Sequence, residues 1–294
     1  MVLAMSAFIV NDALVKVVSE SLPAGQLIVV RGLMASAIVL LIVRLSAGPM
    51  RLRALGNRWV LARAAADAAA TVSYLVSLFH LPIANATAIN MATPLMITLM
   101  AALLLGERVG ARRWLLIGAG FAGVLLVVQP GPEGFNVWGW LCVGSTVLNA
   151  LRDLITRRLP ADAPSGTVAL ASALAVTSLA GVLALVQVMW RADPLATPGG
   201  WVPVTAANLG LLAVAAVFLA AAYRLTVAAT RTGELSVVAP FRYSALLLAV
   251  LLGWLVWGDV PNATAWAGIA LIIAAGMALL RAAMGPTPAR SARG

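Results

Sequence analysis

The sequence predicts an all-α integral membrane protein in which ten transmembrane helices form two inverted five-helix repeats around a central cavity. Apolar residues make up 62% of the 294 positions and charged residues only 10%, far below the roughly 25% charged of a soluble domain. Nearly every part of the chain lies in or beside an apolar run long enough to span a bilayer as a helix, about 17–25 residues. A third observation, an internal duplication, predicts the two repeats.

Proline- and glycine-containing connections separate ten apolar runs, which are the predicted helices. These runs cover residues 2–19, 25–45, 58–80, 84–105, 112–129, 137–158, 166–190, 203–227, 234–257 and 262–281. The first run has no basic leader and is interrupted by Asp12 and Lys16, which indicates a helix of the mature protein and not a signal peptide. The tail, 282–294, is polar and basic, and we expect it to be disordered.

Arginines cluster in alternate connections, for example Arg51 and Arg53 after the second run and Arg112 and Arg113 after the fourth. All these connections lie on one side of the membrane when both termini do. The positive-inside rule makes that side the cytoplasm. We therefore expect a multi-pass protein of a bacterial inner membrane with cytoplasmic termini. The net charge of +10 follows from this topology and does not indicate nucleic-acid binding.

A glycine–acid pair followed by a tryptophan occurs twice with the same internal spacing. The residues are Gly106, Glu107 and Trp114 in the first copy and Gly258, Asp259 and Trp266, 152 positions later, in the second. The duplication predicts two five-span units, 1–130 and 136–281, with opposite orientations because five is odd. Inverted repeats place a substrate site near the midplane, and rocking one half against the other opens that site alternately to the two sides of the membrane. The alternative is a bundle grown by duplication without transport.

Glu107 ends the fourth predicted span beside Arg108. An acid at a helix C-terminus is unfavourable by itself, so we expect a loop ion pair there and not a coupling acid. Small residues recur in the fifth and tenth spans and predict helix-packing faces. These are Gly118, Ala119, Ala122, Gly123, Ala270, Ala274 and Ala278.

The ten spans, the two halves and the stretch from Pro94 to Glu107 resemble the drug/metabolite transporter superfamily, specifically its EamA-type exporters, over about residues 1–281. Lys16 and Arg31 also fall where such proteins often carry basic residues. With Pro240 to Tyr243 in the ninth span, the chain looks most like the YddG-type exporters of aromatic and other amino acids. The second half departs from the pattern, because Leu246 stands where Pro94 would map.

The resemblance implies a basket of ten helices around a central cavity. It implies that the first, third, fourth, sixth, eighth and ninth spans line that cavity and that the fifth and tenth lie at the periphery.

Ionisable side chains inside the spans are the strongest pointers to a site, because lipid cannot solvate them. Asp12 and Lys16 share a helix face, either as a cavity-lining pair that meets a zwitterion or as an intrahelical ion pair. Arg242 lies near midplane depth, and its planar guanidinium suits a carboxylate. The alternative for Arg242 is pairing with Asp67 or Asp153.

Polar residues extend the predicted site. Asn90 and Asn149, in opposite halves, can donate to a carboxylate and accept from an ammonium group, or they can bind a neighbouring helix. Tyr74 and Tyr243 are candidate aromatic walls, although Tyr243 points about 100° away from its neighbour Arg242 around a helix. His80 is a candidate cavity-wall or interfacial hydrogen bonder; a proton-relay role would need a buried partner. The predicted substrate-binding set is Asp12, Lys16, Tyr74, His80, Asn90, Asn149, Arg242 and Tyr243.

Asp12 and Asp67 are the candidates for protonation coupling. Asp67 lies among alanines, which let another helix approach closely. Pairing with Arg63, one helical turn away, is the alternative for Asp67.

Several classes of function are excluded by missing residues. One histidine and one cysteine, Cys142, provide neither a metal site nor a disulfide. No phosphate-binding loop and no catalytic motif is present, so we expect no cofactor and no enzyme activity.

The sequence predicts a secondary transporter that exports amino acids, aromatic ones included, or similar small metabolites. The alternatives are a multidrug or nucleoside-like metabolite exporter of the same fold and, outside that class, a membrane-embedded assembly subunit. The expected partners are an amino acid-like substrate and membrane lipid, and both a monomer and a homodimer remain open.

Overall fold

The computed structural model describes residues 1–45, 55–106, 110–129, 137–160, 163–190, 201–232 and 239–284, and in these residues it contains helices and no strand. The first-half helices are α1 (Val2–Ser19), α2 (Ala24–Leu45), α3 (Arg58–His80), α4 (Ile83–Asn90), α5 (Thr93–Leu105) and α6 (Ala111–Val128). The second-half helices are α7 (Val137–Thr156), α8 (Ser165–Trp190), α9 (Ala206–Thr232), η2 (Ala239–Tyr243), α11 (Ser244–Trp257) and α12 (Ala263–Met284). Glu107 and most of the predicted tail, 285–294, lie outside the described residues.

Hydropathy and length identify the membrane-crossing elements. Seven segments of the described chain are long and apolar enough to cross a bilayer, and a shorter apolar one runs from Phe241 to Trp257. The remaining two helices, α3 with 23 residues and α7 with 20, also have spanning length at 1.5 Å per residue. They carry Asp67 and Arg152 and pack against each other. The chain is therefore an all-helical multi-pass membrane protein, as predicted.

The span predicted over 84–105 is one apolar segment, Ile83–Leu104, but its helix is not continuous. The span is divided into α4 and α5, with Met91 and Ala92 between them. Pro94 has no N–H to donate to the carbonyl of Asn90, and the hydroxyl of Thr93 donates to that carbonyl instead, at 2.6 Å. At the break, a side chain therefore satisfies the Asn90 carbonyl that Pro94 leaves without its helical partner.

The ninth predicted span, 234–257, also has two parts. The 3₁₀ helix η2 contains Pro240 and passes directly into α11 at Ser244, whose hydroxyl donates to the carbonyl of Phe241 at 2.7 Å. Ser244 lies 152 positions after Ala92, the offset of the sequence duplication. Residues 233–238 lie outside the described part of the chain.

The two duplicated glycines have the same structural role. Gly106 ends α5 at φ 66°, and Gly258 ends α11 at φ 71°. These left-handed conformations are costly for residues with a Cβ and close helix C-termini well. In each half, the glycine of the glycine–acid–tryptophan pattern therefore ends a helix.

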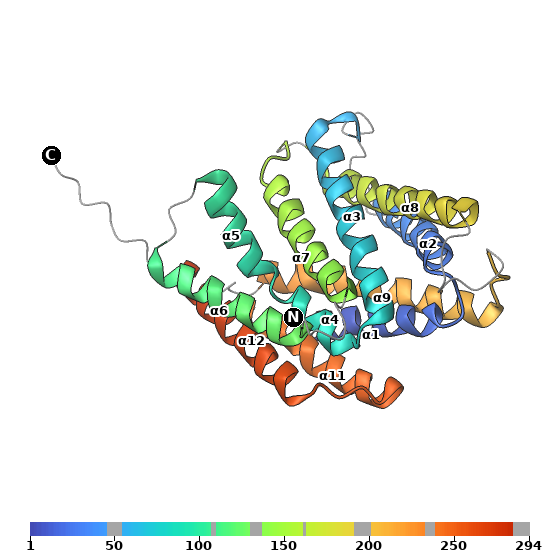
Figure 1. Ribbon diagram of the computed structural model, residues 1–294. Helices are drawn as coiled ribbons and strands as arrows, with labels where there is room; N and C mark the ends of the chain where they lie inside the picture. Colours follow the sequence, from blue (N-terminus) through green and yellow to red (C-terminus); the bar gives the residue numbers. More distant parts are fainter. Residues whose placement is uncertain are drawn as a thin grey trace.

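The helix contacts follow a two-fold pattern. α1 packs on α9, and α3 packs on α7, so exchanging the two halves converts one pair into the other. The pairs α2–α8 and α6–α12 each join an element to its own counterpart. Figure 1 shows α6 and α12 side by side at one edge of the molecule, α2 and α8 at the opposite edge, and α3 and α7 between them.

Close backbone contact holds the α6–α12 edge. A Cβ built on Gly268 would lie 2.6 Å from the carbonyl oxygen of Gly123, and one built on Gly123 would lie 2.8 Å from that of Gly268. The predicted packing face in α6 is confirmed at Gly123. It is wrong at Gly118, around which an added Cβ would meet nothing within 4 Å.

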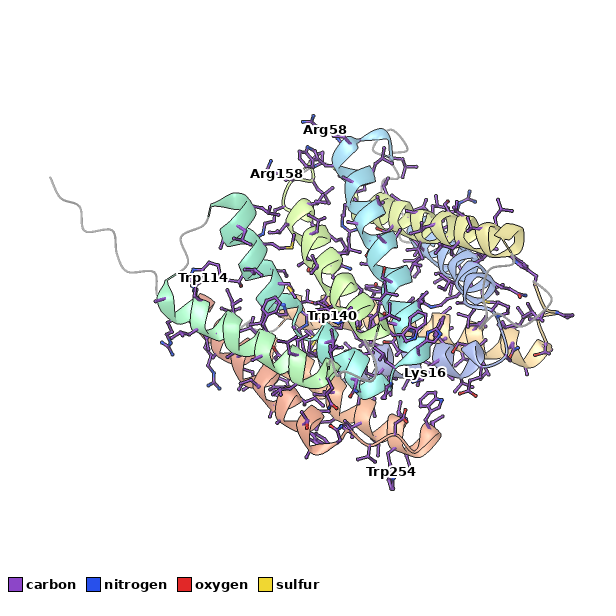
Figure 2. The ribbon with its side chains drawn as sticks, in the orientation of Figure 1. Lys16, Arg58, Trp114, Trp140, Arg158 and Trp254 are labelled. Atoms are coloured by element: carbon purple, nitrogen blue, oxygen red, sulfur yellow. The ribbon has the colours of Figure 1, made fainter. Side chains whose placement is uncertain are left out.

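The two ends of the bundle can be told apart by their charged side chains. Arg58 and Arg158 lie together at one end, each with its guanidinium over the ring of Trp59, at 5.3 and 5.6 Å. Figure 2 shows these two arginines at the end of the molecule away from Lys16 and Trp254. We refer to these below as the arginine-rich end and the Lys16 end.

Candidate substrate-binding site

A cavity of about 360 Å³ lies between the two halves of the chain. Its wall is built by α1, α3, α4, α5, α7, α9 and η2, with one residue each from α2, α11 and α12. Its polar lining consists of Asn11, Asp12, Arg31, Thr71, Tyr74, Thr87, Asn90, Thr93, Asn149, Arg152, Asp153, Tyr223, Thr226, Arg242 and Tyr243. A cavity of this size with a few convergent polar groups is typical of a small-molecule site.

Asp12 is held in the cavity wall by hydrogen bonds to both of its carboxylate oxygens. The hydroxyl of Tyr74 donates to one oxygen at 2.9 Å, and the amide of Asn11 donates to the other at 2.8 Å. Tyr74 belongs to α3, so the carboxylate links α1 to α3. The structure therefore places Asp12 and Tyr74 of the predicted set in contact with each other.

Arg31 lies in the same wall and is only 7% exposed. It is attracted electrostatically by Asp12, but no carboxylate of the described residues lies within the 4.0 Å of an ion pair. Its Nε is buried without a hydrogen-bond partner among the described residues. Arg31 is therefore a cation in the cavity wall with unused donors.

Arg152, by contrast, is fully engaged. Its guanidinium lies 3.0 Å from Asp67 of α3 and 2.8 Å from its neighbour Asp153. Asp67 also lies 3.7 Å from Arg63, so the predicted one-turn pairing occurs within a larger network. Asp67 does not line the cavity, whereas Asp153 and Arg152 do.

The two predicted asparagines meet across the halves. The Nδ2 of Asn149 approaches the Oδ1 of Asn90 at 3.4 Å, and the Thr93 hydroxyl approaches the same oxygen at 3.3 Å. Both asparagines line the cavity at the break between α4 and α5. The helix-to-helix contact, one of the two predicted alternatives, therefore occurs, and both side chains also line the cavity.

Arg242 and Tyr243 both line the cavity although they are neighbours in η2. Arg242 is exposed, and the described residues place no carboxylate within ion-pair distance of it, because Asp67 and Asp153 pair with Arg152. Tyr243 is 8% exposed, and its hydroxyl has no hydrogen-bond partner among the described residues.

Lys16 lies outside the cavity lining and does not pair with Asp12. Its ammonium group donates to the carbonyl of Leu81 and lies 4.9 Å from the centroid of the Trp257 ring. The Trp257 indole in turn donates to Glu20 at 2.7 Å. These four residues, which we name the Lys16 latch, join α1, the α3–α4 connection and α11 at the Lys16 end.

His80 also lies at the Lys16 end, outside the cavity lining. Its ring stacks on Trp138 with centroids 3.7 Å apart, and its Nδ1 lies 2.8 Å from the carbonyl of Val76. His80 is exposed, and the hydrogen bonds described for it involve backbone only. This arrangement is that of an interfacial side chain and gives no support to a proton relay.

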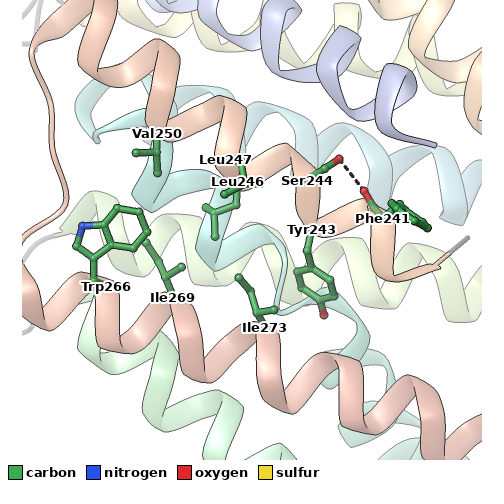
Figure 3. Close-up of a pocket in the computed structure, with 9 residues that line it drawn as sticks. All are labelled: Phe241, Tyr243, Ser244, Leu246, Leu247, Val250, Trp266, Ile269 and Ile273. Atoms are coloured by element: carbon green, nitrogen blue, oxygen red, sulfur yellow. Dashed lines mark hydrogen bonds between the residues drawn. The ribbon is translucent and has the colours of Figure 1, made fainter. Parts of the chain in front are cut away.

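A second hollow, of about 290 Å³, lies between α11 and α12 and is shown in Figure 3. Leucine, isoleucine, valine and aromatic side chains make up its wall, apart from the hydroxyls of Tyr243 and Ser244. Leu247, 73% exposed, and Trp266, 42% exposed, border it, as expected for a surface that faces lipid tails. The polar cavity, and not this groove, is the candidate site.

Nine polar cavity residues, among them Arg31 and Tyr223, are absent from the substrate-binding set that the sequence predicts. Tyr223 of α9 packs edge-on against Phe8 of α1, with ring centroids 5.2 Å apart, and both line the cavity. The sequence signals for Arg31 are its charge inside a predicted span and its place where EamA-type exporters often carry basic residues. Among the described residues, no cluster of histidine, cysteine and acidic side chains is suited to a metal.

Comparison with known proteins identifies the family. The EamA-like transporter family matches residues 1–129 and again 137–281. A solved structure with a TM-score of 0.62 covers 96% of this chain and 96% of its own, at 20% identity, which supports the fold alone.

Three relatives carry names that describe transport. The pseudopaline exporter CntI of Pseudomonas aeruginosa is 31% identical over 287 residues, covering 97% of this chain and 95% of that protein. A riboflavin transporter of Rhizobium johnstonii is 32% identical over 209 residues, 71% of this chain and 65% of that protein's length. An S-adenosylmethionine uptake transporter of Rickettsia bellii is 24% identical over 203 residues, 69% of this chain and 65% of that protein. The chain belongs to the EamA-like transporter family and is a transporter, not an enzyme, as its sequence predicts.

Proposed function

We propose that this transporter exports amino acids, aromatic ones included, or similar small metabolites from the cytoplasm by alternating access. The proposal is carried by the central cavity, which presents both signs of charge beside aromatic side chains. Asp12 and Asp153 supply the carboxylates, Arg31 and Arg242 supply cations without an ion-pair partner among the described residues, and Tyr74 supplies an aromatic wall. A zwitterion with an apolar side chain matches such a lining.

The named relatives support the class of substrate and leave its identity open. Their names refer to three different small metabolites, riboflavin, pseudopaline and S-adenosylmethionine. A multidrug exporter of cations would favour an acidic, aromatic pocket without a cavity-facing arginine. Three arginines line this cavity, which favours the amino acid-like substrate.

Two repeats of opposite orientation, residues 1–130 and 136–281, are part of the proposal. They are supported by the paired elements, by the matching helix stops at Gly106 and Gly258, and by two family matches, 1–129 and 137–281. We place the arginine-rich end in the cytoplasm of a bacterial inner membrane, with both termini, on the positive-inside rule. Inverted repeats with broken helices at a central site are a recurring design of secondary transporters.

The direct test is flux in proteoliposomes that contain only the purified protein. The panel includes phenylalanine, leucine, riboflavin and the cation ethidium, each with and without a pH gradient. We expect saturable phenylalanine flux and no ethidium flux. Acceleration by the pH gradient would assign proton coupling, for which Asp12 is the proposed group because Asp67 is held by arginines. Flux of ethidium without amino acid flux would refute the proposal in favour of a multidrug exporter.

Alternating access predicts that the Lys16 latch closes the outer side. In a Cys142→Ala background, the cavity residue Thr71 is replaced by cysteine and exposed to an impermeant thiol reagent from outside the cell. Lys16→Ala is expected to raise the labelling rate about 10-fold, because loss of a charge-assisted hydrogen bond shifts the equilibrium by roughly 1.4 kcal/mol. The rate of labelling, followed by mass shift, is the measurement.

Trp257→Ala should act in the same direction as Lys16→Ala, since it removes the ring beneath the ammonium group. Trp254→Ala is the matched control, because Trp254 lies on the same helix and is 56% exposed. Equal labelling rates in all four proteins would show that the latch does not control outer access.

A further inference from the structure

Buried polar atoms without partners concentrate in the wall of the central cavity. Six such side-chain atoms occur among the described residues, and four of them belong to cavity-lining residues: Asn11, Arg31, Thr87 and Tyr243, of which the Tyr243 hydroxyl lies toward Gly276 of α12. Native proteins rarely leave buried polar groups unsatisfied, because their lost hydration is not replaced. The concentration in one wall indicates a site whose hydrogen bonds are completed by a bound solute and its water.

Arg31 is the charged member of this group. At 7% exposure, it is more than nine-tenths buried, and it is the eighth residue of α2 (Ala24–Leu45). An ion inside a membrane segment is costly unless it is paired or has a function. Arg152, which lines the same cavity, has two carboxylates at 3.0 and 2.8 Å. The described residues give Arg31 no such pair.

The surroundings of Arg31 decide which anion fits. Asp12 attracts Arg31 electrostatically, but both of its oxygens already accept hydrogen bonds, from Tyr74 and Asn11. Arg31 and Asp12 together carry no net charge, so a dianion such as phosphate would meet repulsion from Asp12. A solute that carries one carboxylate and one ammonium group satisfies both side chains. The planar guanidinium also offers the two parallel donors that a carboxylate accepts.

We propose that Arg31 binds the carboxylate of the transported solute and that Asp12, held by Tyr74, faces its ammonium group. This assigns the carboxylate to the buried arginine of α2 and not to the exposed Arg242. The inference rests on the proposed function, since it names the substrate groups recognised by the same site.

The test compares two solutes that differ only in the carboxylate, phenylalanine and phenethylamine, in proteoliposomes. The ratio of their fluxes is measured within each preparation, so differences in the amount of folded protein cancel. Wild-type protein should prefer phenylalanine. Arg31→Gln should lower this preference about 10- to 100-fold, the loss expected for a charge-assisted hydrogen bond. Arg31→Lys, which keeps the charge but not the planar fork, should give an intermediate ratio, and it provides a second variant if Arg31→Gln does not fold.

Arg44→Gln is the matched control, because Arg44 is an exposed arginine in the last turn of the same helix, and it should retain the wild-type ratio. An unchanged ratio in Arg31→Gln, with wild-type flux intact, would refute the role of Arg31 and leave the proposed function standing. Absence of phenylalanine and leucine flux in the wild type would instead refute the proposed function, and the inference with it.

Discussion

Gly268→Leu is expected to destabilise the folded transporter severely, because it forces apart two helices whose backbones touch. A Cβ at position 268 would lie 2.6 Å from the carbonyl oxygen of Gly123 and 2.9 Å from side-chain atoms of Leu126 and Val127. The first obstacle is backbone, which cannot move aside by changing a rotamer. Overpacking a tight interior costs roughly 1–3 kcal/mol and occasionally more, and we expect at least about 3 kcal/mol for this substitution.

The physical reason lies in the membrane. Lipid tails are as apolar as leucine, so α6 and α12 are not driven together by the hydrophobic effect and depend on close packing. Separating them removes the contacts between Gly123, Gly268 and Ile272. We expect Gly268→Leu to lose the monodisperse peak in size-exclusion chromatography after mild heating in detergent, at temperatures where the wild type retains it.

Gly118→Leu is the matched control for this prediction. Gly118 lies on α6 with nothing within 4 Å of an added Cβ, and it is exposed. Leucine is a better helix former than glycine by about 0.8 kcal/mol, so this variant should be as stable as the wild type or slightly more. If Gly268→Leu and Gly118→Leu lost their monodisperse peaks at the same temperature, the close contact between α6 and α12 would not stabilise the fold.

Arg152→Gln is expected to cause a smaller but still substantial loss of stability. The substitution removes the cation that lies 3.0 Å from Asp67 and 2.8 Å from Asp153, and it leaves carboxylates in a partly buried place. Full burial would make such a loss about 3–5 kcal/mol. The three side chains are 25%, 17% and 40% exposed, so water screens part of the interaction and we expect about 2 kcal/mol.

A double-mutant cycle separates the ion pair from general disruption. Asp67→Asn should restore part of the stability of Arg152→Gln, because two neutral amides can bond without an unpaired charge, and the coupling energy should be about 1 kcal/mol or more. Unfolding in mixed micelles with increasing denaturing detergent measures both values. Arg158→Gln, an exposed arginine just after the same helix, gives up only its contact with the Trp59 ring and should change stability by less than about 1 kcal/mol. Strict additivity of the two substitutions would contradict a direct pair.

The sequence predicts most helix ends closely because the thickness of the bilayer fixes the length of an apolar helix. α1 and α3 begin and end at the predicted residues, and α2 differs by one residue at its start. The break at Met91 and Ala92 does not follow from the sequence. Pro94 is compatible with a kink, a helix end or a helix start, and local propensity does not choose among these.

The site is predictable in part. Polarity and depth in the membrane point to Asp12, Tyr74, Asn90, Asn149 and Arg242, and these residues line one cavity. The same grounds point to Lys16 and His80, which lie at the Lys16 end instead. Asp12 and Lys16 lie one turn apart on the same face of α1. Asp12 nevertheless contacts Tyr74 and Asn11, whereas Lys16 contacts Leu81 and Trp257.

By itself, the sequence determined that this protein is a helical multi-pass membrane protein, because apolar length is a local property, and its similarity to known sequences assigned it to the EamA-like transporter family. Only the tertiary structure decided the partners of the buried charges. Helical periodicity fixes which residues share a face, but the neighbour of that face comes from distant segments. Arg152 therefore meets Asp67, Lys16 meets Leu81 and Trp257, and Arg31 lines the cavity without an ion-pair partner among the described residues.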